Sequence, residues 1–498
     1  MTYKITLIGV AFLGCAFTSY AQKMSLNSDV QSAWVTVPPG VKPVNENVLI
    51  RAGNTITIDA DASCNNLAIE KAAILTSTKA DANGATPALQ AGVATDSAAI
   101  SNSGTFGGDA DGLTLRIPAK SKYLIIKGTG KNVIGSITPV SNHDALTVDI
   151  TEDVTLNAKG VALSANGNKG AVINIGKNTT VTLSNTDGVL QTGKGTYNIN
   201  GTLDMAATAS QTINSSPQDN VILNVNGKFK LGKALSIASN TYNKQIQLNI
   251  ADGGLVDATN TDVLNLGQNF FAIKGNGALL RLVDSRDAVF PVGIAGADAA
   301  NGVVLKNTGK AGYFKVGIKN KADAPIQRED RILDKQWIIT PESGTANFDL
   351  RISPSWTTAD QKETLDPSTT IAVKQVDGGD HQYSEAGLSG RGQAYAPFTA
   401  SATGFKTGGS FTVIKHDHVA FTAYPNPAID QVTITHPKAV EGAYINITTL
   451  FGKKVFETIA VAGNKNTLLN INALDNGIYI VKFDNGGKNY AVKIIKSK

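Results

Sequence analysis

The chain has 498 residues, 49 of them glycine, with only 6% aromatic residues and a formal net charge of +5. This length exceeds what one ordinary hydrophobic core holds, so about two to four domains are expected. The nearly balanced charge and the scattered lysines argue against a nucleic-acid partner. The composition favours thin, repetitive β-structure over a large enzyme core.

Residues 1–21 have the pattern of a secretory signal peptide. Lys4 supplies a positively charged start, and residues 5–17 form an apolar core that is too short to span a membrane. Small residues precede position 22, so we expect cleavage between Ala21 and Gln22. The mature chain is therefore predicted to be exported.

The two cysteines are Cys15 and Cys64. If the leader is removed, the mature chain keeps only Cys64, and no internal disulfide can form. We predict that Cys64 is a small buried apolar residue rather than a nucleophile. The alternative for the leader is a lipoprotein signal, in which Leu13, Gly14 and Cys15 form the lipid-attachment motif.

Residues 22–285 are predicted to form one solenoid, which begins with a proline-bearing cap. A short alternating apolar run recurs about every 25 residues, and a fixed period in this range indicates a solenoid. The last apolar residue of each run is Ile150, Ile175, Ile199, Val225, Ile250 and Ile273.

The residue types decide which solenoid forms. Apolar residues alternate with Asn, Thr and Lys, and a period of two predicts strands. Coils of this length built only from strands predict a right-handed parallel β-helix, with rungs about 4.8 Å apart. Each coil then depends on its neighbours to bury its apolar face. Glycine and asparagine are expected at the turns, because they tolerate a left-handed backbone.

One polar position recurs within the repeat. Asp149 is followed at the equivalent positions by Asn174, Asn198, Asn224 and Asn249. Side chains stacked at one position in a β-helix can satisfy each other by hydrogen bonds. The sequence therefore predicts an asparagine ladder with a structural role.

Residues 286–415 have a different sequence pattern, in which apolar runs are separated by 10 to 25 residues and bounded by Gly, Pro, Asp and Asn. This spacing predicts an antiparallel β-sandwich. We expect Trp337 and Trp356 to anchor its core, and the alternative is an aromatic platform for a sugar.

Residues 422–498 carry four motifs in order, after a predicted linker at 416–421. They are Tyr-Pro-Asn-Pro, a Gly-Lys turn, a Gly-Ile-Tyr strand and a final Lys-Ile-Ile-Lys. Glycines 452 and 477 are expected at hairpin turns that need a positive φ. The residues concerned are Tyr424, Pro425, Asn426, Pro427, Gly452, Lys453, Gly477, Ile478, Tyr479 and Lys493.

These motifs are similar to the type A C-terminal sorting domain of the type IX secretion system. The region before them, with its Phe-Pro-Val-Gly start and its Trp337 strand, resembles a module that often precedes such domains in secreted Bacteroidota proteins. The resemblance implies export by the type IX machinery, with the protein at the cell surface or released. It also implies that a sortase cuts the domain off near the linker and that the cargo can be attached to surface lipopolysaccharide.

Candidate chemistry outside these motifs is sparse. The acidic group Asp149, Glu152 and Asp153 is expected to be a solvated corner, with a metal site as the alternative. Residues 109–112 resemble a fragment of a Ca²⁺ loop but lack its later ligands. His416 and His418 lie in the linker. The sequence predicts no cofactor and no metal.

The function predicted from the sequence is that of an exported, non-enzymatic β-helix protein at the cell surface or in the medium. An adhesive or structural role is expected, because a long Asn, Thr and Lys face suits hydrogen bonds to a glycan, a matrix or a host ligand. The alternative is a carbohydrate-active β-helix enzyme, a polysaccharide lyase or a glycoside hydrolase, whose acidic residues converge only in three dimensions.

Overall fold

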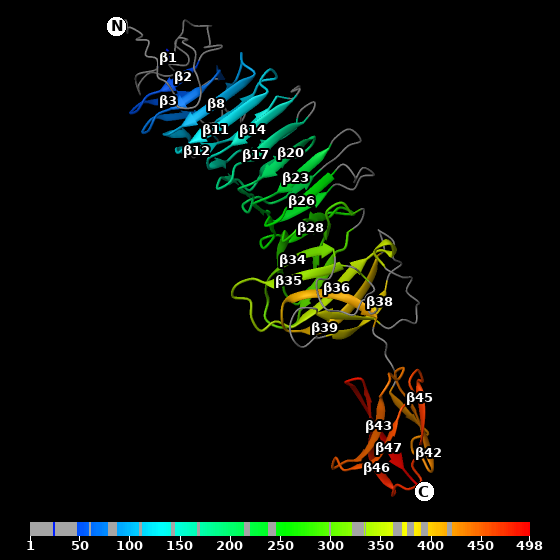
Figure 1. The fold of residues 1–498 in the computed structure, drawn as a ribbon. Helices are drawn as coiled ribbons and strands as arrows, with labels where there is room; N and C mark the ends of the chain where they lie inside the picture. Colours follow the sequence, from blue (N-terminus) through cyan, green and yellow to red (C-terminus); the bar gives the residue numbers. More distant parts are fainter. Residues whose placement is uncertain are drawn as a thin grey trace, which may run out of the picture. The chain divides into compact units, whose positions relative to one another are not determined.

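A computed structural model describes the chain at residues 23–24, 47–58, 61–77, 87–108, 112–140, 145–166, 170–213, 220–237, 246–297, 300–320, 333, 335–361, 371–375, 383–389, 397–415 and 421–498. Within these ranges the chain is all β apart from one short 3-10 helix, η3 (Thr358–Asp360), which confirms the predicted class (Figure 1). No helix in the described ranges is long and apolar enough to cross a bilayer.

Residues 48–294 form a parallel β-helix, as predicted, in which each coil contributes up to three strands (Figure 1). Strands at the same place in successive coils pair side by side into three sheets. Sheet I has twelve strands: β1 (Lys23–Met24), β2 (Val48–Ile50), β5 (Leu67–Ile69), β8 (Ser97–Asn102), β11 (Tyr123–Gly128), β14 (Leu146–Ile150), β17 (Ala171–Ile175), β20 (Gly195–Ile199), β23 (Val221–Val225), β26 (Ile246–Ile250), β29 (Phe271–Ile273) and β32 (Val292–Ile294).

The other two sheets close the coil. Sheet II contains β3 (Thr55–Ile58), β6 (Ile74–Ser77), β9 (Thr105–Gly107), β12 (Lys131–Ile134), β15 (Val154–Leu156), β18 (Thr180–Leu183), β21 (Thr202–Asp204), β24 (Lys228–Lys230), β27 (Leu255–Asp257) and β30 (Ala278–Val283). Sheet III contains β4 (Ala62–Cys64), β7 (Ala88–Ala91), β10 (Thr114–Ile117), β13 (Ser136–Pro139), β16 (Gly160–Ser164) and β19 (Gly188–Gln191), then separately β22 (Gln211–Ile213), β25 (Ala234–Ile237) and β28 (Val263–Asn265).

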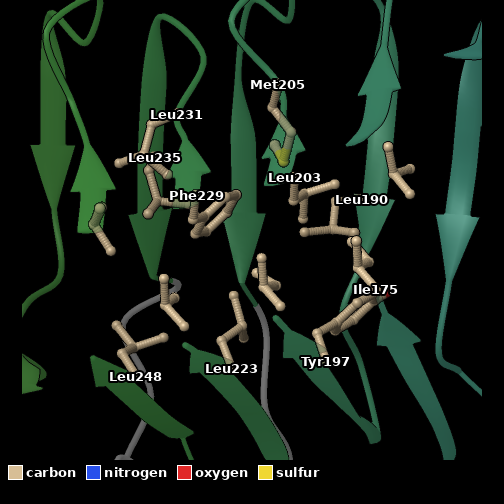
Figure 2. Packing of buried hydrophobic residues seen from close by; sticks show 14 of the residues in the cluster. Ile175, Leu190, Tyr197, Leu203, Met205, Leu223, Phe229, Leu231, Leu235 and Leu248 are labelled. Atoms are coloured by element: carbon tan, nitrogen blue, oxygen red, sulfur yellow. The ribbon is translucent and has the colours of Figure 1, made fainter. Parts of the chain in front are cut away.

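Alternate residues of sheet I point into the coil, and this explains the repeat. Ile150 pairs with Ile175, which pairs with Ile199, and all three are fully buried. Figure 2 shows Tyr197 of sheet I and Phe229 of sheet II within the same interior cluster. Full burial of such a side chain contributes about 1.5–3 kcal/mol. The inward-pointing side chains of successive coils therefore stack on one another and form the core of the solenoid.

Two Asn-Gly turns show why glycine recurs at the corners after sheet I. A Cβ on Gly227 would lie 2.1 Å from the carbonyl oxygen of Gly201, and a Cβ on Gly201 would lie 2.2 Å from that of Thr179. Neither glycine has a positive φ. The expectation of a left-handed backbone is therefore wrong at these two turns, where close stacking of the coils excludes a side chain.

The solenoid passes into antiparallel sheets through a shared strand. β30 pairs in parallel with β27 and antiparallel with β34 (Gly312–Asn320). Sheet I also continues past residue 285, where the sequence repeat ends, because β32 pairs with β29. One hydrophobic cluster runs from Ile50 to Val413. The two regions therefore share a continuous core.

The remaining strands before residue 416 are antiparallel. They are β31 (Ala288–Phe290), β33 (Val303–Asn307), β35 (Lys335–Pro341), β36 (Leu350–Trp356), β37 (Ile371–Gln375), β38 (Tyr383–Ser389), β39 (Phe398–Phe405) and β40 (Gly409–Lys415). Trp337 and Trp356 are both 0% exposed. They are core residues, as predicted, and the alternative of an exposed sugar platform is wrong.

Residues 416–498 form a separate compact unit. One sheet contains β41 (Thr422–Tyr424), β42 (Gln431–Thr435) and β45 (Asn466–Asn470). The other contains β44 (Lys454–Ile459), β43 (Tyr444–Thr449), β46 (Gly477–Asn485) and β47 (Lys488–Lys496). Side chains of both sheets, such as Val432, Leu469, Val481 and Phe483, fill a core of their own.

Candidate functional site

The predicted asparagine ladder is present, and it lies on the outer side of sheet I. Nδ2 of Asn174 donates to Oδ1 of Asp149 over 2.7 Å. Asn198, Asn224 and Asn249 repeat this bond in turn, each donating from Nδ2 to the Oδ1 of the residue before it over 2.7–2.8 Å. The side chains are half-buried, while the residues between them point into the core.

The ladder has a direction and a charged first member. Asp149 accepts from Asn174 through one carboxylate oxygen and from the hydroxyl of Tyr123 through the other, over 2.6 Å. Each asparagine therefore donates one N–H in the direction of Asp149. The carbonyl of Asn249 ends the row, and the next residue in register is Ala272, whose methyl group cannot donate.

A second, shorter row runs beside the first at the following turn. Nδ2 of Asn226 donates to Oδ1 of Asn200 over 2.8 Å. The corresponding residue of the next coil is Ala251. The shorter row therefore ends one coil before the first, because Asn226 follows β23 whereas Asn249 lies in β26. Their last members lie beside a hollow of about 280 Å³, lined by Asn198, Asn224, Asn226, Asn249, Ile250, Ala251, Ala272, Lys274 and Ala295.

The predicted solvated corner at residues 149–153 is wrong for Glu152, whereas Asp153 is exposed. Glu152 is only 8% exposed, and neither of its carboxylate oxygens has a hydrogen-bond partner. Burial is the largest cause and raises its pKa from 4.5 to about 7, while the polar groups of Asn132 and Gly130, which lie nearby without a hydrogen bond of normal geometry to the carboxylate, offset part of the rise. Asp153 accepts instead from the amide of Thr180 over 2.7 Å. The turn packs against the neighbouring coil, which sequence spacing does not reveal.

The other candidate residues have clear positions or fall outside the described ranges. Cys64 is buried and free, as predicted, and burial raises the pKa of its thiol to about 12. Residues 109–111, His416, His418 and the expected cleavage position at Ala21 and Gln22 lie outside the described residues. Within the described ranges no group of three or more His, Cys, Asp or Glu could hold a metal ion.

The Tyr-Pro-Asn-Pro motif lies along the edge of β47. Pro425 and Pro427 have no N–H to offer a neighbouring strand. Asn426 supplies the missing groups with its side chain: Nδ2 donates to the Lys493 carbonyl oxygen and Oδ1 accepts from the Ile495 amide, each over 2.8 Å. The structure therefore joins the first motif of the domain to the last one.

Backbone hydrogen bonds of Ala428 extend the contact between the Tyr-Pro-Asn-Pro motif and β47, whereas the side chain of Tyr424 does not take part in it. The amide of Ala428 donates to the Ile495 carbonyl over 2.8 Å, and the amide of Ser497 donates to the Ala428 carbonyl over 2.9 Å. Tyr424 is 79% exposed. The motif is thus fixed to the domain by Asn426 and Ala428, while its tyrosine faces solvent.

The Gly-Lys turn is a hairpin between β43 and β44. Gly452 has a φ of +81°, as predicted, and its amide donates to the Thr449 carbonyl oxygen over 3.0 Å. The Thr449 amide donates to the Lys453 carbonyl oxygen. Phe451 at the tip is 99% exposed. The turn therefore presents a large apolar ring to solvent.

The expectation for Gly477 is wrong. Gly477 is the first residue of β46 and pairs with Lys496, and its φ is not positive. The segment before it connects two different sheets, β45 to β46, so no hairpin forms there. The strand that follows alternates as predicted: Ile478 is exposed and Tyr479 is buried, with its hydroxyl donating to the Asp475 carbonyl oxygen.

Sequence reasoning missed His436, which is fully buried in the C-terminal unit. Its Nε2 lies 2.7 Å from Oγ1 of Thr467, and its Nδ1 lies 2.7 Å from the Pro437 carbonyl oxygen. The ring also packs on Phe483, with ring centroids 4.5 Å apart. A lone histidine carries no sequence signal for this role, because its partners come from other parts of the domain.

Comparison with known families identifies the C-terminal unit. Residues 422–497 match the model of the secretion system C-terminal sorting domain. This domain marks the chain for the type IX system, which delivers it to the cell surface or the extracellular space, and it implies contact with the type IX machinery. No curated protein and no solved structure matches the chain.

Proposed function

Because its sorting domain directs the chain through type IX secretion, we propose that the β-helix works outside the outer membrane as a non-enzymatic adhesive or structural module. The ladder from Asn174 to Asn249 carries this proposal. Each amide uses one N–H within the row, so a second N–H and a carbonyl lone pair stay available to a partner. Neutral amides of this kind bind, whereas proton-transfer catalysis relies on groups such as His, Asp, Glu and Lys.

The outer side of sheet II gives a useful contrast. Lys230 pairs with Asp204 over 2.6 Å, and Lys228 pairs with Asp257 over 2.8 Å. These charges satisfy each other within the solenoid, and exposed pairs of this kind contribute little to stability. From β17 to β26 the outward positions of sheet I carry no charged side chain: the asparagines of the ladder stand beside Val172, Thr196, Ile222 and Gln247. We therefore place the binding face on sheet I.

The proposal is tested with the secreted protein purified from its host and applied to glycan, matrix and cell arrays. Binding that weakens in an Asn198→Ala, Asn224→Ala double variant is the expected result. An array on which the folded protein binds nothing would contradict the proposal. Turnover of a glycan that is lost when one acidic residue is neutralised would favour the alternative, a carbohydrate-active enzyme.

For the export route, we propose that residues 1–21 are removed as a signal peptide and that a sortase cuts the chain within 416–421. The mature protein is then attached to surface lipopolysaccharide or released. The motif residues, from Tyr424 to Lys493, form the recognition element. Mass spectrometry of both termini in the surface and medium fractions tests this route. A mature chain that starts with a lipidated Cys15 and keeps residue 498 would overturn it.

A further inference from the structure

The first asparagine row ends one coil beyond the second, and the hollow lies beside both ends. Asn226 is the last member of its row, and Ala251 stands at its position in the next coil. Asn249 lies in that same coil as Ala251 and is the last member of the longer row, and Ala272 stands at its position one coil further on. No described group donates to Oδ1 of Asn249 or of Asn226. A further asparagine side chain would occupy the space beside each carbonyl. The hollow lies where the next side chain of each row would stand, and we call it the ladder-end hollow.

The chemistry of the ladder-end hollow selects its ligand. The side-chain carbonyls of Asn226 and Asn249 can accept hydrogen bonds from a ligand, and the second N–H groups of Asn224 and Asn249 can donate to it. Hydroxyl groups supply both. The exposed ammonium of Lys274 lines the same space and disfavours a metal cation. These features together fit a neutral or anionic ligand that is rich in hydroxyl groups.

Size and surroundings agree with this choice. A volume of about 280 Å³ is close to the lower end of ligand pockets, roughly 300 Å³, and the hollow is open to solvent. At the next coil, Gly293 has no side chain, and a Cβ there would lie 2.4 Å from the ring of Phe270. An aromatic ring thus covers sheet I one rung beyond Ala272, where it can pack on the apolar face of a sugar.

We propose that the ladder-end hollow binds one end of a carbohydrate chain, with Asn226 and Asn249 accepting from its hydroxyl groups and Lys274 donating to its oxygens. The rest of the chain then lies along the ladder, whose amides repeat at the rung spacing of about 4.8 Å. This inference rests on the proposed binding role of sheet I and names the ligand class and its position.

The test fills the hollow without disturbing the core. Ala272→Asn adds the missing rung, so its amide donates to Asn249 Oδ1 and occupies the hollow. Lys274→Gln removes the ammonium. The matched control is Lys177→Gln, at an exposed lysine on the turn after β17. Neutral and uronic-acid oligosaccharides serve as probes, and binding is measured by calorimetry with the full secreted protein.

The expected result is oligosaccharide binding by the wild type and the control, with affinity reduced about tenfold in Ala272→Asn, since the hydrogen bond to Asn249 Oδ1 is lost and the new side chain takes up part of the hollow. A melting temperature at or above that of the wild type shows that the variant is folded. A greater loss for uronic-acid than for neutral probes in Lys274→Gln assigns Lys274 to an anionic group. An equal loss for both probes assigns it to hydroxyls.

Three results would overturn the inference, and they differ in what they leave standing. If folded Ala272→Asn binds the oligosaccharides as well as the wild type does, the hollow is not the site, while a binding role elsewhere on sheet I survives. If the wild type binds a protein or matrix probe but no oligosaccharide, the ligand class is wrong. Failure to bind anything would remove the proposed function as well.

Discussion

Glu152 illustrates how one side chain can depend on the coil next to it. The carboxyl group is buried between stacked turns without a hydrogen-bond partner. Such a group favours its neutral form, because burial penalises the charge. Ionisation of Glu152 therefore lowers the stability of the folded protein, and the protonated group carries no such penalty.

This predicts a stability that falls as the pH rises. The pKa is 4.5 in the unfolded chain and about 7 in the folded one, so between these values the folded state binds one more proton, and the free energy of unfolding decreases with pH. Below pH 4.5 the free energy of unfolding is not reduced by Glu152. Above pH 7 the reduction is complete and amounts to about 3 kcal/mol. Glu152→Gln should raise the melting temperature at pH 8 and change it little at pH 4.

Thermal unfolding of both proteins across this pH range is the measurement. Asp153→Asn serves as the control, because Asp153 is a neighbouring carboxylate that accepts a hydrogen bond from the Thr180 amide. Equal melting temperatures for wild type and Glu152→Gln at pH 8 would show that Glu152 carries no buried charge.

Asn426 gives a second prediction at the residue scale. Asn426→Ala removes both bonds to β47, and a cost of about 1–2 kcal/mol is expected for the C-terminal unit. If the motif must be held on β47 to be recognised, less protein should reach the surface and more should remain in the cell. Immunoblots of cell fractions measure this, with the exposed Asn472→Ala as control. Normal export of Asn426→Ala would show that the position of the motif is unimportant.

At the scale of elements, a hydrogen-bonded row acts as one unit. Asn198 both donates to Asn174 and accepts from Asn224. Asn198→Ala should therefore destabilise the solenoid by about 1–2 kcal/mol, whereas Thr196→Ala on the same strand should have a smaller effect. A double-mutant cycle with Asn174→Ala measures the coupling, which is expected to be non-zero because the side chains touch. If the destabilisations of the two single variants add up to that of the double variant, the two side chains are not coupled, and hydrogen bonding along the row does not stabilise the solenoid.

The antiparallel region is linked by a buried charge pair. The ammonium of Lys335 contacts Asp360 and Asn301, and Lys335 and Asn301 are buried. Asp360 also accepts from the Asn301 amide over 2.7 Å. Lys335→Met removes the counter-charge of the half-buried Asp360, which keeps its hydrogen bonds from Asn301 and Thr357, so we expect a loss of about 1–3 kcal/mol. Denaturant unfolding measures this loss, and Lys335→Met with Asp360→Asn should recover part of it. No recovery would mean that the loss comes from packing.

At the scale of the whole molecule, the shared strand β30 determines which fragments of the chain can fold independently. A fragment that ends at residue 285 keeps β30 but removes its antiparallel partner β34, and it exposes a long strand edge. We expect this fragment to aggregate. Residues 416–498 have a separate core and should fold as an isolated fragment. Size-exclusion chromatography and circular dichroism test both, and a monodisperse 22–285 fragment would contradict the first expectation.

The sequence by itself determined the features that repeat or follow a local order. A period of two within runs and about 25 between them specifies a parallel β-helix, because inward residues recur wherever coils stack. Equivalent positions also predict the ladder from Asp149 to Asn249. The four motifs of the last domain are local, so they could be recognised from their order alone.

Only the tertiary structure decided the features that depend on contacts between segments. These are the third strand of each coil, the burial of Glu152, the contact of Asn426 with β47 and the pairing of β30 with two regions. Each depends on how distant backbones approach one another, and hydrogen bonding and burial at such contacts leave no period in the sequence. The ladder-end hollow belongs here too, because Ala251 and Ala272 line a site only where stacking brings the ends of two amide rows, one coil apart, beside the same hollow.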